Sequence, residues 1–383
     1  MKICFVCSEY PPGPHGGIGT CVQVLGRGLA RAGHVVRVVG VYRQDYPAAD
    51  YEEDQSVRVW RLRTPSGRFA GVRSRYRLYR MISRWIRHGE VDLVEVPDWE
   101  GWSAGWPRLP VPVVVRANNP NYFVVGLGEA AVSCYRYWLE RAGFRRADRW
   151  CAVSRFMATQ CSKFFALKSG PGAILFNPVD VPDGPALPRS TNQVVFTGTL
   201  VFKKGIVSLI EAWSTVAAEH PEAELHVYGK DRPTRNGGSM IDLLRSKLSG
   251  VAVSRAFFHG HVSRERVYAA LRTARVAVFP SYAEAFGLAP VESMACGCPT
   301  IFTTRTAGPE VIQHGRDGLL VEPDQPCQIA ASILRVLRDD ALAKELGAAG
   351  YQTVLQKFTI DVLLPQNIAF YEETIQRFHA GRS

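Results

Sequence analysis

Glu284-Ala-Phe-Gly-Leu-Ala-Pro-Val-Glu292 is the stretch that decides the fold, because it sets two carboxylates apart across a glycine turn. The apolar run from Val276 to Phe279 comes shortly before it and has the β-branched and aromatic content of a buried strand. Pro280 ends that run, and Pro290 suits the first turn of a helix. We therefore predict a strand, a loop and then a helix that begins near Leu288.

The start of this helix is a candidate site for a diphosphate. Free N–H groups at a helix N-terminus attract anions. Glu284 stays on the loop ahead of the helix, and Glu292 lies about one turn inside it, at ~1.5 Å rise per residue. A carboxylate does not bind the anion itself, but it accepts hydrogen bonds from hydroxyl groups. A sugar at either end of a diphosphate is the shape of a sugar nucleotide, which is the ligand we predict here.

Length and composition indicate a globular protein with two domains. The chain has 383 residues, of which 46% are hydrophobic and 21% charged. No stretch approaches the ~20 apolar residues that span a bilayer, and the first residues predict a strand rather than a signal peptide. The nine cysteines show neither a disulfide framework nor zinc-ligand spacing. We expect reduced thiols, no metal, and a cytoplasmic location.

The net charge of +11 is concentrated between Arg58 and His88, where ten arginines occur without an acidic residue. Nucleic acid is not the partner we expect, because the chain has no recognisable nucleic-acid-binding motif. Within this region an apolar stripe at helical spacing lies beside an arginine stripe. The apolar stripe consists of Val72, Tyr76, Tyr79, Ile82 and Ile86.

Such a basic amphipathic helix can lie on an anionic membrane surface. The predicted membrane patch consists of Arg73, Arg77, Arg80, Arg84, Trp85 and Arg87. In the alternative interpretation the apolar face packs on its own domain and water solvates the arginines.

Strand-like and helix-like segments alternate along the whole chain, which is typical of parallel sheets covered by helices. Prolines and a glycine between residues 178 and 188 interrupt the series and indicate a linker. We predict an α/β fold with two Rossmann-like domains, residues 1–178 and 179–358, and ligands in the cleft between them at the carboxyl ends of the strands. Residues 359–383 are helical in pattern and are predicted to pack back on the first domain.

A second glycine-rich loop, Pro11-Pro-Gly-Pro-His-Gly-Gly-Ile-Gly19, follows the first predicted strand. Gly16 and Gly17 permit positive φ and a close approach of the backbone to a phosphate, so we predict that they contact the donor. The loop is not G-x-G-x-x-G, and no acidic residue follows at the position expected for a dinucleotide ribose. A nicotinamide-dependent enzyme is therefore a poor match.

With the residues around it, the glutamate pair resembles the E-x7-E signature of family 4 of the retaining glycosyltransferases. Further matches extend through most of the chain and are densest from 194 to 323. They are Asn177-Pro-Val-Asp180, Leu225-His-Val-Tyr-Gly229, Phe258-His-Gly-His-Val262, Ala295-Cys-Gly-Cys-Pro299, Pro309-Glu-Val-Ile312 and Gly318-Leu-Leu-Val321. The resemblance implies a GT-B fold with an interdomain cleft and a C-terminal crossover helix. It also implies metal-independent sugar transfer from a UDP- or GDP-sugar with anomeric retention, and the chain contains no D-x-D motif.

The resemblance also assigns roles to individual residues. Glu284 contacts the donor sugar, Glu292 holds the ribose, and Lys204 neutralises the diphosphate from the loop Gly198-Thr-Leu-Val-Phe-Lys-Lys-Gly205. The implied catalytic residues are Glu284, Lys204 and Asn118. The implied donor-binding residues are Gly16, Gly17, Thr199, Lys204, Glu284, Ala285, Phe286, Gly287, Leu288 and Glu292. The implied acceptor-binding residues are Asp98, Trp99 and Asn118.

Two of these positions depart from the pattern of the family. Thr199 stands where arginine is common, and Asn118 (or Asn119, if the match shifts by one residue) stands where histidine is common. An amide donates hydrogen bonds but does not titrate near neutral pH. A catalytically impaired partner subunit is therefore an alternative to an active transferase. A glycoside hydrolase with Glu284 as nucleophile would also need an acid partner across the sugar, and none is evident.

The acceptor is the least constrained part of the prediction. The basic helix favours a lipid-linked acceptor at the inner face of the cell membrane, and hence a role in surface polysaccharide or glycolipid synthesis. A soluble small-molecule acceptor is the alternative. The motifs leave the donor base and the donor sugar open.

Overall fold

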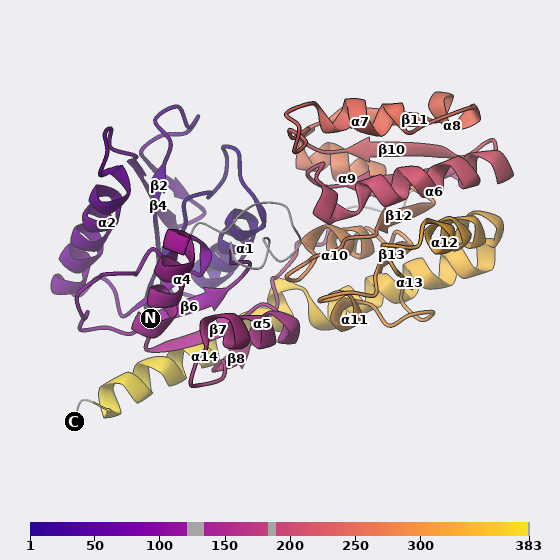
Figure 1. Cartoon of the computed structure of the whole chain (residues 1–383). Helices are drawn as coiled ribbons and strands as arrows, with labels where there is room; N and C mark the ends of the chain where they lie inside the picture. Colours follow the sequence, from indigo (N-terminus) through magenta and orange to yellow (C-terminus); the bar gives the residue numbers. More distant parts are fainter. Residues whose placement is uncertain (121–133, 183–188, 382–383) are drawn as a thin grey trace. The chain divides into compact units, whose positions relative to one another are not determined.

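The computed structural model describes residues 1–120, 134–182 and 189–381, and these residues form two compact α/β units (Figure 1). Unit 1 contains residues 1–120, 134–178 and 360–381, and unit 2 contains residues 179–182 and 189–359. The predicted α/β class with two Rossmann-like domains is confirmed. Most of the predicted linker falls in residues 183–188, outside the described residues.

Unit 1 is built on a sheet of eight strands in the order β3-β4-β2-β1-β5-β6-β7-β8, in which β3 and β4 pair antiparallel and the other pairs are parallel. The strands are β1 (Lys2–Val6), β2 (Val35–Tyr42), β3 (Tyr51–Asp54), β4 (Val57–Arg63), β5 (Leu93–Pro97), β6 (Val113–Ala117), β7 (Arg149–Ala152) and β8 (Ala173–Ile174). The middle strands β1, β5 and β6 are almost entirely buried and mostly apolar, and the charged Glu95 of β5 and Arg116 of β6 pair with each other.

The helices of unit 1 surround this sheet (Figure 1). They are α1 (Gly17–Arg31), α2 (Ala70–Arg87), the 3-10 turn η1 (Trp99–Gly101), α4 (Cys134–Arg146), α5 (Arg155–Phe165) and the C-terminal α14 (Ile360–Ala380). The core of the unit brings Ile3 and Phe5 of β1 against Leu25 of α1, and Phe370 and Tyr371 of α14 join the same cluster. Helix α14 is therefore part of the core of unit 1, although it is the last helix of the chain.

Unit 2 is built on a sheet of six strands in the order β11-β10-β9-β12-β13-β14, and every pair in it is parallel. The strands are β9 (Gln193–Thr197), β10 (Glu224–Tyr228), β11 (Ala256–Gly260), β12 (Val276–Phe279), β13 (Thr300–Thr303) and β14 (Leu319–Val321). The helices are η2 (Phe202–Lys204, a 3-10 turn), α6 (Ile206–Glu219), α7 (Met240–Ser246), α8 (Val251–Ser254), α9 (Arg264–Thr273), α10 (Leu288–Ala295), α11 (Gly308–Val311), α12 (Pro326–Arg338) and α13 (Asp340–Lys357).

The strand order of unit 2 reverses between β9 and β12. The chain leaves β9 toward β10 and β11 on one side and then crosses to β12, which pairs with the other edge of β9. Ligands of open parallel sheets bind at such a switch point, outside the carboxyl ends of the strands. The loops that follow β9 and β12 are therefore where a site is expected in this unit.

The apolar stripe of α2 is partly buried and partly exposed. Ile82 and Ile86 are buried, as in the alternative interpretation, but Val72 and Tyr76 are each 59% exposed. Trp85 is 8% exposed and packs against Trp60 of β4, with 4.6 Å between the ring centroids. The assignment of Trp85 to the membrane patch is therefore wrong, because the aromatic ring of Trp60 draws it into the core of unit 1.

The five arginines of the predicted membrane patch are all exposed. Among the described residues, no helix combines the length and the apolar character that crossing a membrane requires.

Candidate functional site

Lys204 and Glu284 come together in unit 2 because they follow neighbouring parallel strands. Lys204 ends the turn after β9, and Glu284 lies in the loop after β12. Their Nζ and Oε1 atoms are 2.6 Å apart, with 25% and 12% of the two side chains exposed. The sequence placed both residues at the donor, and the structure joins them as a partly buried ion pair.

Close contacts between the two loops hold this pair in place. Gly205 has φ of +68°, and a Cβ there would lie 1.7 Å from the carbonyl oxygen of Pro280, so only glycine fits. The backbone N–H of Tyr282 donates to the carbonyl of Lys203 at 2.8 Å. The Ser281 hydroxyl donates to Glu284 Oε1 at 3.1 Å. The loop after β9 and the loop after β12 thus behave as one structure.

Helix α10 begins at Leu288 as predicted, and its N-cap residue is a glycine, which has no side chain of its own to cap the helix. Gly287 is the N-cap with φ of +95°, and a Cβ there would lie 2.7 Å from the Phe302 ring. Phe286 is 2% exposed and packs edge-on against Phe358. Phe286 can therefore offer a ligand only its backbone, and the start of α10 keeps the positive end of its dipole for an anion.

The second glutamate of the pair, Glu292, lies within α10 and is bound by residues that the sequence analysis did not single out. Arg264 Nη2 donates to Glu292 Oε1 at 2.9 Å, and the Tyr268 hydroxyl donates to the same oxygen at 3.2 Å. Arg264 Nη1 also donates to Asp180 at 3.2 Å. Burial raises the pKa of Glu292, and the nearby Arg264 opposes that shift. No sequence motif pointed to Arg264, because only the packing of α9 on α10 reveals its partner.

The remaining predicted donor residues of unit 2 are Thr199 and Ala285. Thr199 is exposed on the loop that follows β9, where the resemblance implies an arginine. Ala285 is partly exposed in the loop between β12 and α10. Both therefore lie on the loops that carry Lys204 and Glu284.

In unit 1 the predicted acceptor residues follow the neighbouring strands β5 and β6. Asp98 is 1% exposed and accepts hydrogen bonds from the backbone N–H groups of Trp99 at 2.9 Å and Asn119 at 3.1 Å. Burial, together with the nearby charge of Glu140, raises the pKa of Asp98 to about 8. The Asp98 carboxyl therefore connects the segments that follow β5 and β6. Trp99 is partly exposed at the end of β5.

Asn118 is 6% exposed, and its Nδ2 donates to the backbone carbonyl of Arg116 at 3.1 Å. Arg116 itself is buried and donates to both carboxylate oxygens of Glu95, at 2.7 and 3.0 Å. It also donates to Asn367 at 2.7 Å and to the Tyr371 hydroxyl at 3.1 Å, both on α14. The C-terminal helix thus supports the strand from which the Asn118 loop leaves.

The glycine loop of unit 1 differs from its prediction. Gly16 has an extended backbone with φ of −118°, and Gly17 is the first residue of α1, so neither uses the positive φ that glycine permits. The carboxylate of Glu9 accepts a hydrogen bond from the backbone N–H of Gly19 at 2.9 Å. A Cβ at Gly19 would lie 1.9 Å from the Glu9 carbonyl oxygen, so the close approach here is to the chain itself. An internal carboxylate therefore occupies the α1 N-terminus, and burial raises its pKa.

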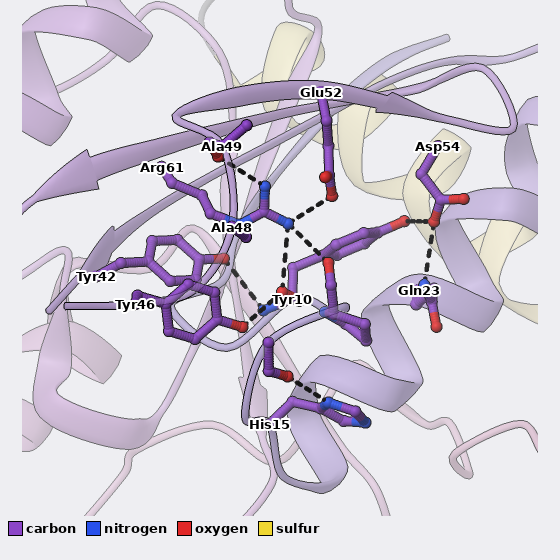
Figure 2. A network of polar contacts seen from close by, with 12 residues as sticks. Tyr10, His15, Gln23, Tyr42, Tyr46, Ala48, Ala49, Glu52, Asp54 and Arg61 are labelled. Carbon is purple, nitrogen blue, oxygen red and sulfur yellow. Dashed lines mark hydrogen bonds and ion pairs between the residues drawn. The ribbon is translucent and has the colours of Figure 1, made fainter. Parts of the chain in front are cut away.

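A buried arginine, Arg61, supports the first residues of this glycine loop through hydrogen bonds. Figure 2 shows Arg61 reaching Glu52 and Ala49. Arg61 Nη2 is 2.5 Å from Glu52 Oε1, and Arg61 Nη1 donates to the carbonyl oxygen of Ala49 at 3.0 Å. It also donates to the Pro11 carbonyl at 2.7 Å. The Tyr46 hydroxyl donates to the Tyr10 carbonyl at 3.0 Å. The antiparallel β3–β4 hairpin thus fixes the first residues of the loop, which explains one of the ten arginines as structural.

Among the described residues, no group of three or more His, Cys, Asp or Glu side chains is arranged to hold a metal ion. Lys204 and Glu284 form one ion pair in the loops before α10, and Arg264 and Glu292 form a second one on α9 and α10.

Two family models match this chain. The model described as "Glycosyl transferase 4-like domain" matches residues 16–171, and the model described as "Glycosyl transferases group 1" matches residues 182–353. The two matched ranges lie in unit 1 and unit 2, respectively, apart from residues outside the described ranges.

Curated relatives and solved structures resemble the chain over nearly its whole length. Glycogen synthase of Mycobacterium tuberculosis is 27% identical over 94% of this chain and 91% of its own. Phosphatidyl-myo-inositol mannosyltransferase of Mycolicibacterium smegmatis is 25% identical over 97% of this chain and 94% of its own.

Among solved structures, sucrose-phosphate synthase from Thermosynechococcus elongatus has a TM-score of 0.80 with 22% identity, covering 98% of this chain and 99% of its own. Anabaena HepE, solved in complex with UDP and glucose, has a TM-score of 0.72 with 16% identity, covering 96% and 98%. These likenesses show the GT-B fold.

Proposed function

Since this chain belongs to the group 1 glycosyltransferases, we propose that it transfers a hexose from a UDP- or GDP-sugar to a hydroxyl acceptor and retains the anomeric configuration. It is a hexosyltransferase of family 4 that uses a nucleotide sugar. The donor base, the stereochemistry and the acceptor are the parts that we propose.

The observation that carries the donor assignment is the Lys204–Glu284 pair in the loops that lead to the glycine-capped start of α10. A diphosphate seated at that helix start meets the positive end of the helix dipole. The Lys204 ammonium can exchange its hydrogen bond with Glu284 for one with a phosphate oxygen, which frees Glu284 to accept from a sugar hydroxyl. Glu292 then accepts from the ribose at the other end of the diphosphate.

This arrangement supports departure of the diphosphate without a metal ion. Negative charge grows on the phosphate oxygen as the bond to the anomeric carbon breaks, and groups fixed in advance stabilise that charge. Lys204 and the backbone N–H groups at the start of α10 are such groups. We propose that the acceptor hydroxyl attacks the anomeric carbon from the face that the diphosphate leaves, and that its proton passes to the departing phosphate oxygen.

We place the acceptor at unit 1, near Trp99 and Asn118. The Asn118 amide can donate to a hydroxyl or carbonyl of a sugar but cannot carry a proton in the reaction at neutral pH. The Asn118 Nδ2 donates one hydrogen bond to the Arg116 carbonyl, which fixes the amide and supports a hydrogen-bonding role. A catalytically impaired subunit is the competing possibility, because Thr199 and Asn118 both depart from the residues common in the family.

The test of the donor site is the protection that UDP and GDP give against heat. At least one of them should raise the melting temperature, and Glu292→Ala should reduce affinity about tenfold, because it removes the ribose acceptor. Glu345→Ala, an exposed position on α13, is the matched control and should bind as the wild type does. Unchanged affinity in Glu292→Ala, or no protection by either nucleotide, would exclude the proposed site. Radiolabelled nucleotide sugars then separate turnover from binding without turnover.

We propose a lipid-linked acceptor and a peripheral membrane location, in the synthesis of a surface polysaccharide or glycolipid. The support comes from α2, where Phe69, Val72 and Tyr76 are each about 60% exposed beside Arg73 and Arg77. An anionic lipid surface complements exposed apolar and cationic side chains on one helix. One relative is named for a phosphatidyl-inositol acceptor, which is in line with this proposal. A soluble acceptor is the alternative, and vesicle binding distinguishes the two.

A further inference from the structure

Each glutamate of the Glu284–Glu292 pair has a basic partner, yet only Lys204 belongs to a motif that the family shares. We propose that Arg264 is a positioning residue of the donor site, which fixes the Glu292 carboxylate in place and keeps it ionised for the ribose. This inference rests on the proposed function, in which Glu292 accepts hydrogen bonds from the ribose.

The geometry of Arg264 suits this role. It is the first residue of α9, directly after the N-cap Ser263, and its guanidinium lies over the Tyr268 ring at 4.9 Å from the centroid. One terminal nitrogen donates to Glu292 Oε1 at 2.9 Å and the other to Asp180 at 3.2 Å. The guanidinium is therefore held from three sides, and its planar fork bridges two carboxylates in a way that an ammonium cannot reproduce.

Only one oxygen of Glu292 is used by these contacts. Arg264 and the Tyr268 hydroxyl both donate to Oε1. Among the described residues, none donates a hydrogen bond to Oε2, so that oxygen keeps its lone pairs for a ligand. A carboxylate fixed through one oxygen presents the other in a defined direction, which is what recognition of a ribose hydroxyl requires.

The charge of Arg264 matters because Glu292 is poorly solvated. Only 18% of the Glu292 side chain is exposed. Burial raises its pKa, the Asp180 charge acts in the same direction, and Arg264 and the Tyr268 hydroxyl act in the opposite direction. Cys296, on the same helix, is the other titratable group that interacts with this carboxylate. Loss of Arg264 therefore leaves burial and Asp180 unopposed, and Glu292 takes up a proton at a higher pH.

The experiment measures the affinity for UDP and GDP from about pH 5.5 to about pH 8 in the full-length chain. In Arg264→Gln we expect affinity close to that of the wild type at the alkaline end and a loss that grows toward the acidic end, because burial and Asp180 then raise the pKa of Glu292 unopposed. Arg264→Lys should restore part of the loss, because it returns the charge without the fork. Titration of the nucleotide itself is common to all variants and cancels in the comparison.

Tyr268→Phe gives a second measurement that leaves the arginine and the size of the side chain unchanged. It removes one of the two hydrogen-bond donors to Glu292 Oε1. The affinity for the nucleotide at acidic pH should therefore fall as in Arg264→Gln, but by less. Circular dichroism checks that each variant is folded.

Two results would overturn the inference. An Arg264→Gln variant with the pH profile of the wild type would show that the arginine does not act through Glu292. A loss of affinity that is equal at every pH would overturn the claim that the arginine keeps Glu292 ionised. If Glu292→Ala weakens nucleotide binding in either case, the proposed function stands without this inference. If Glu292→Ala binds as the wild type does, the donor site itself fails.

Discussion

At the scale of single residues, Lys204 is the side chain on which the donor site depends most. Without a donor its ammonium is 2.6 Å from Glu284, so the two catalytic candidates neutralise each other in a partly buried position. Binding of a diphosphate replaces that partner with one of greater negative charge. The ion pair therefore holds both groups at the proposed donor site. The resemblance implies two cations in this loop, an arginine and a lysine. Thr199 stands at the arginine position, and Lys204 occupies the lysine position.

Removal of this ammonium should lower kcat far more than it changes KM. We expect Lys204→Ala to reduce kcat by about a hundredfold to a thousandfold, as removal of a group that stabilises developing charge does. The neighbouring Lys203→Ala is the matched control for the loss of one charge and should keep most of the activity. Steady-state kinetics with the nucleotide sugar that protects the chain provides the measurement. Equal loss in both variants would show that net charge, rather than the placement of Lys204, matters.

At the scale of elements, α2 illustrates how packing divides one helix into two parts. Leu78, Ile82 and Trp85 bury its C-terminal half against unit 1, whereas Val72 and Tyr76 leave the N-terminal half exposed. The apolar stripe that the sequence predicted along the whole helix is therefore buried in its C-terminal half and exposed in its N-terminal half. The exposed half is the part of α2 that is available to a membrane.

Vesicle binding should accordingly depend on the exposed arginines from Arg73 to Arg80 of α2. We expect Arg73→Gln, Arg77→Gln and Arg80→Gln in combination to weaken binding to anionic vesicles by on the order of a hundredfold, at about 1 kcal/mol for each arginine. Sedimentation with phosphatidylglycerol vesicles and with neutral phosphatidylcholine vesicles measures this.

The matched control removes the same charge from unit 2, with Arg316→Gln, Arg335→Gln and Lys344→Gln, all at exposed positions. It should bind vesicles as the wild type does. Equal weakening in both triple variants, or no binding of the wild type, would argue for a soluble acceptor.

At the scale of the whole molecule, the chain returns to unit 1 with its last helix. Tyr371 of α14 donates its hydroxyl to Glu95 at 2.7 Å and accepts from Arg116 at 3.1 Å. These groups are buried under the sheet of unit 1, so an unsatisfied member is costly. The end of the chain therefore stabilises the strands from which the acceptor loops leave.

Loss of that hydroxyl should destabilise unit 1 rather than unit 2. We expect Tyr371→Phe to lower the free energy of unfolding of unit 1 by about 1–3 kcal/mol, because two buried partners lose a hydrogen bond. Hydrogen exchange resolved by peptide distinguishes the units. Tyr351→Phe, a partly exposed tyrosine of α13 in unit 2, is the control and should change little. Faster exchange spread equally over both units would contradict the prediction.

The sequence by itself determined the α/β class, the parallel strands at the centre of both sheets, the family and the start of α10 at Leu288, but not the antiparallel β3–β4 pair at the edge of unit 1. These features depend on local patterns, since apolar runs, prolines and glycines act on the residues next to them. It also named Lys204, Glu284 and Glu292, whose proposed roles are those that the resemblance to the family implies.

Only the tertiary structure decided what those side chains contact. Arg264 meets Glu292, Glu9 occupies the start of α1, and Trp85 turns inward to Trp60. Each of these contacts joins residues that are distant in the chain or on different elements. No local pattern encodes them, because the partner is set by which helix packs on which strand.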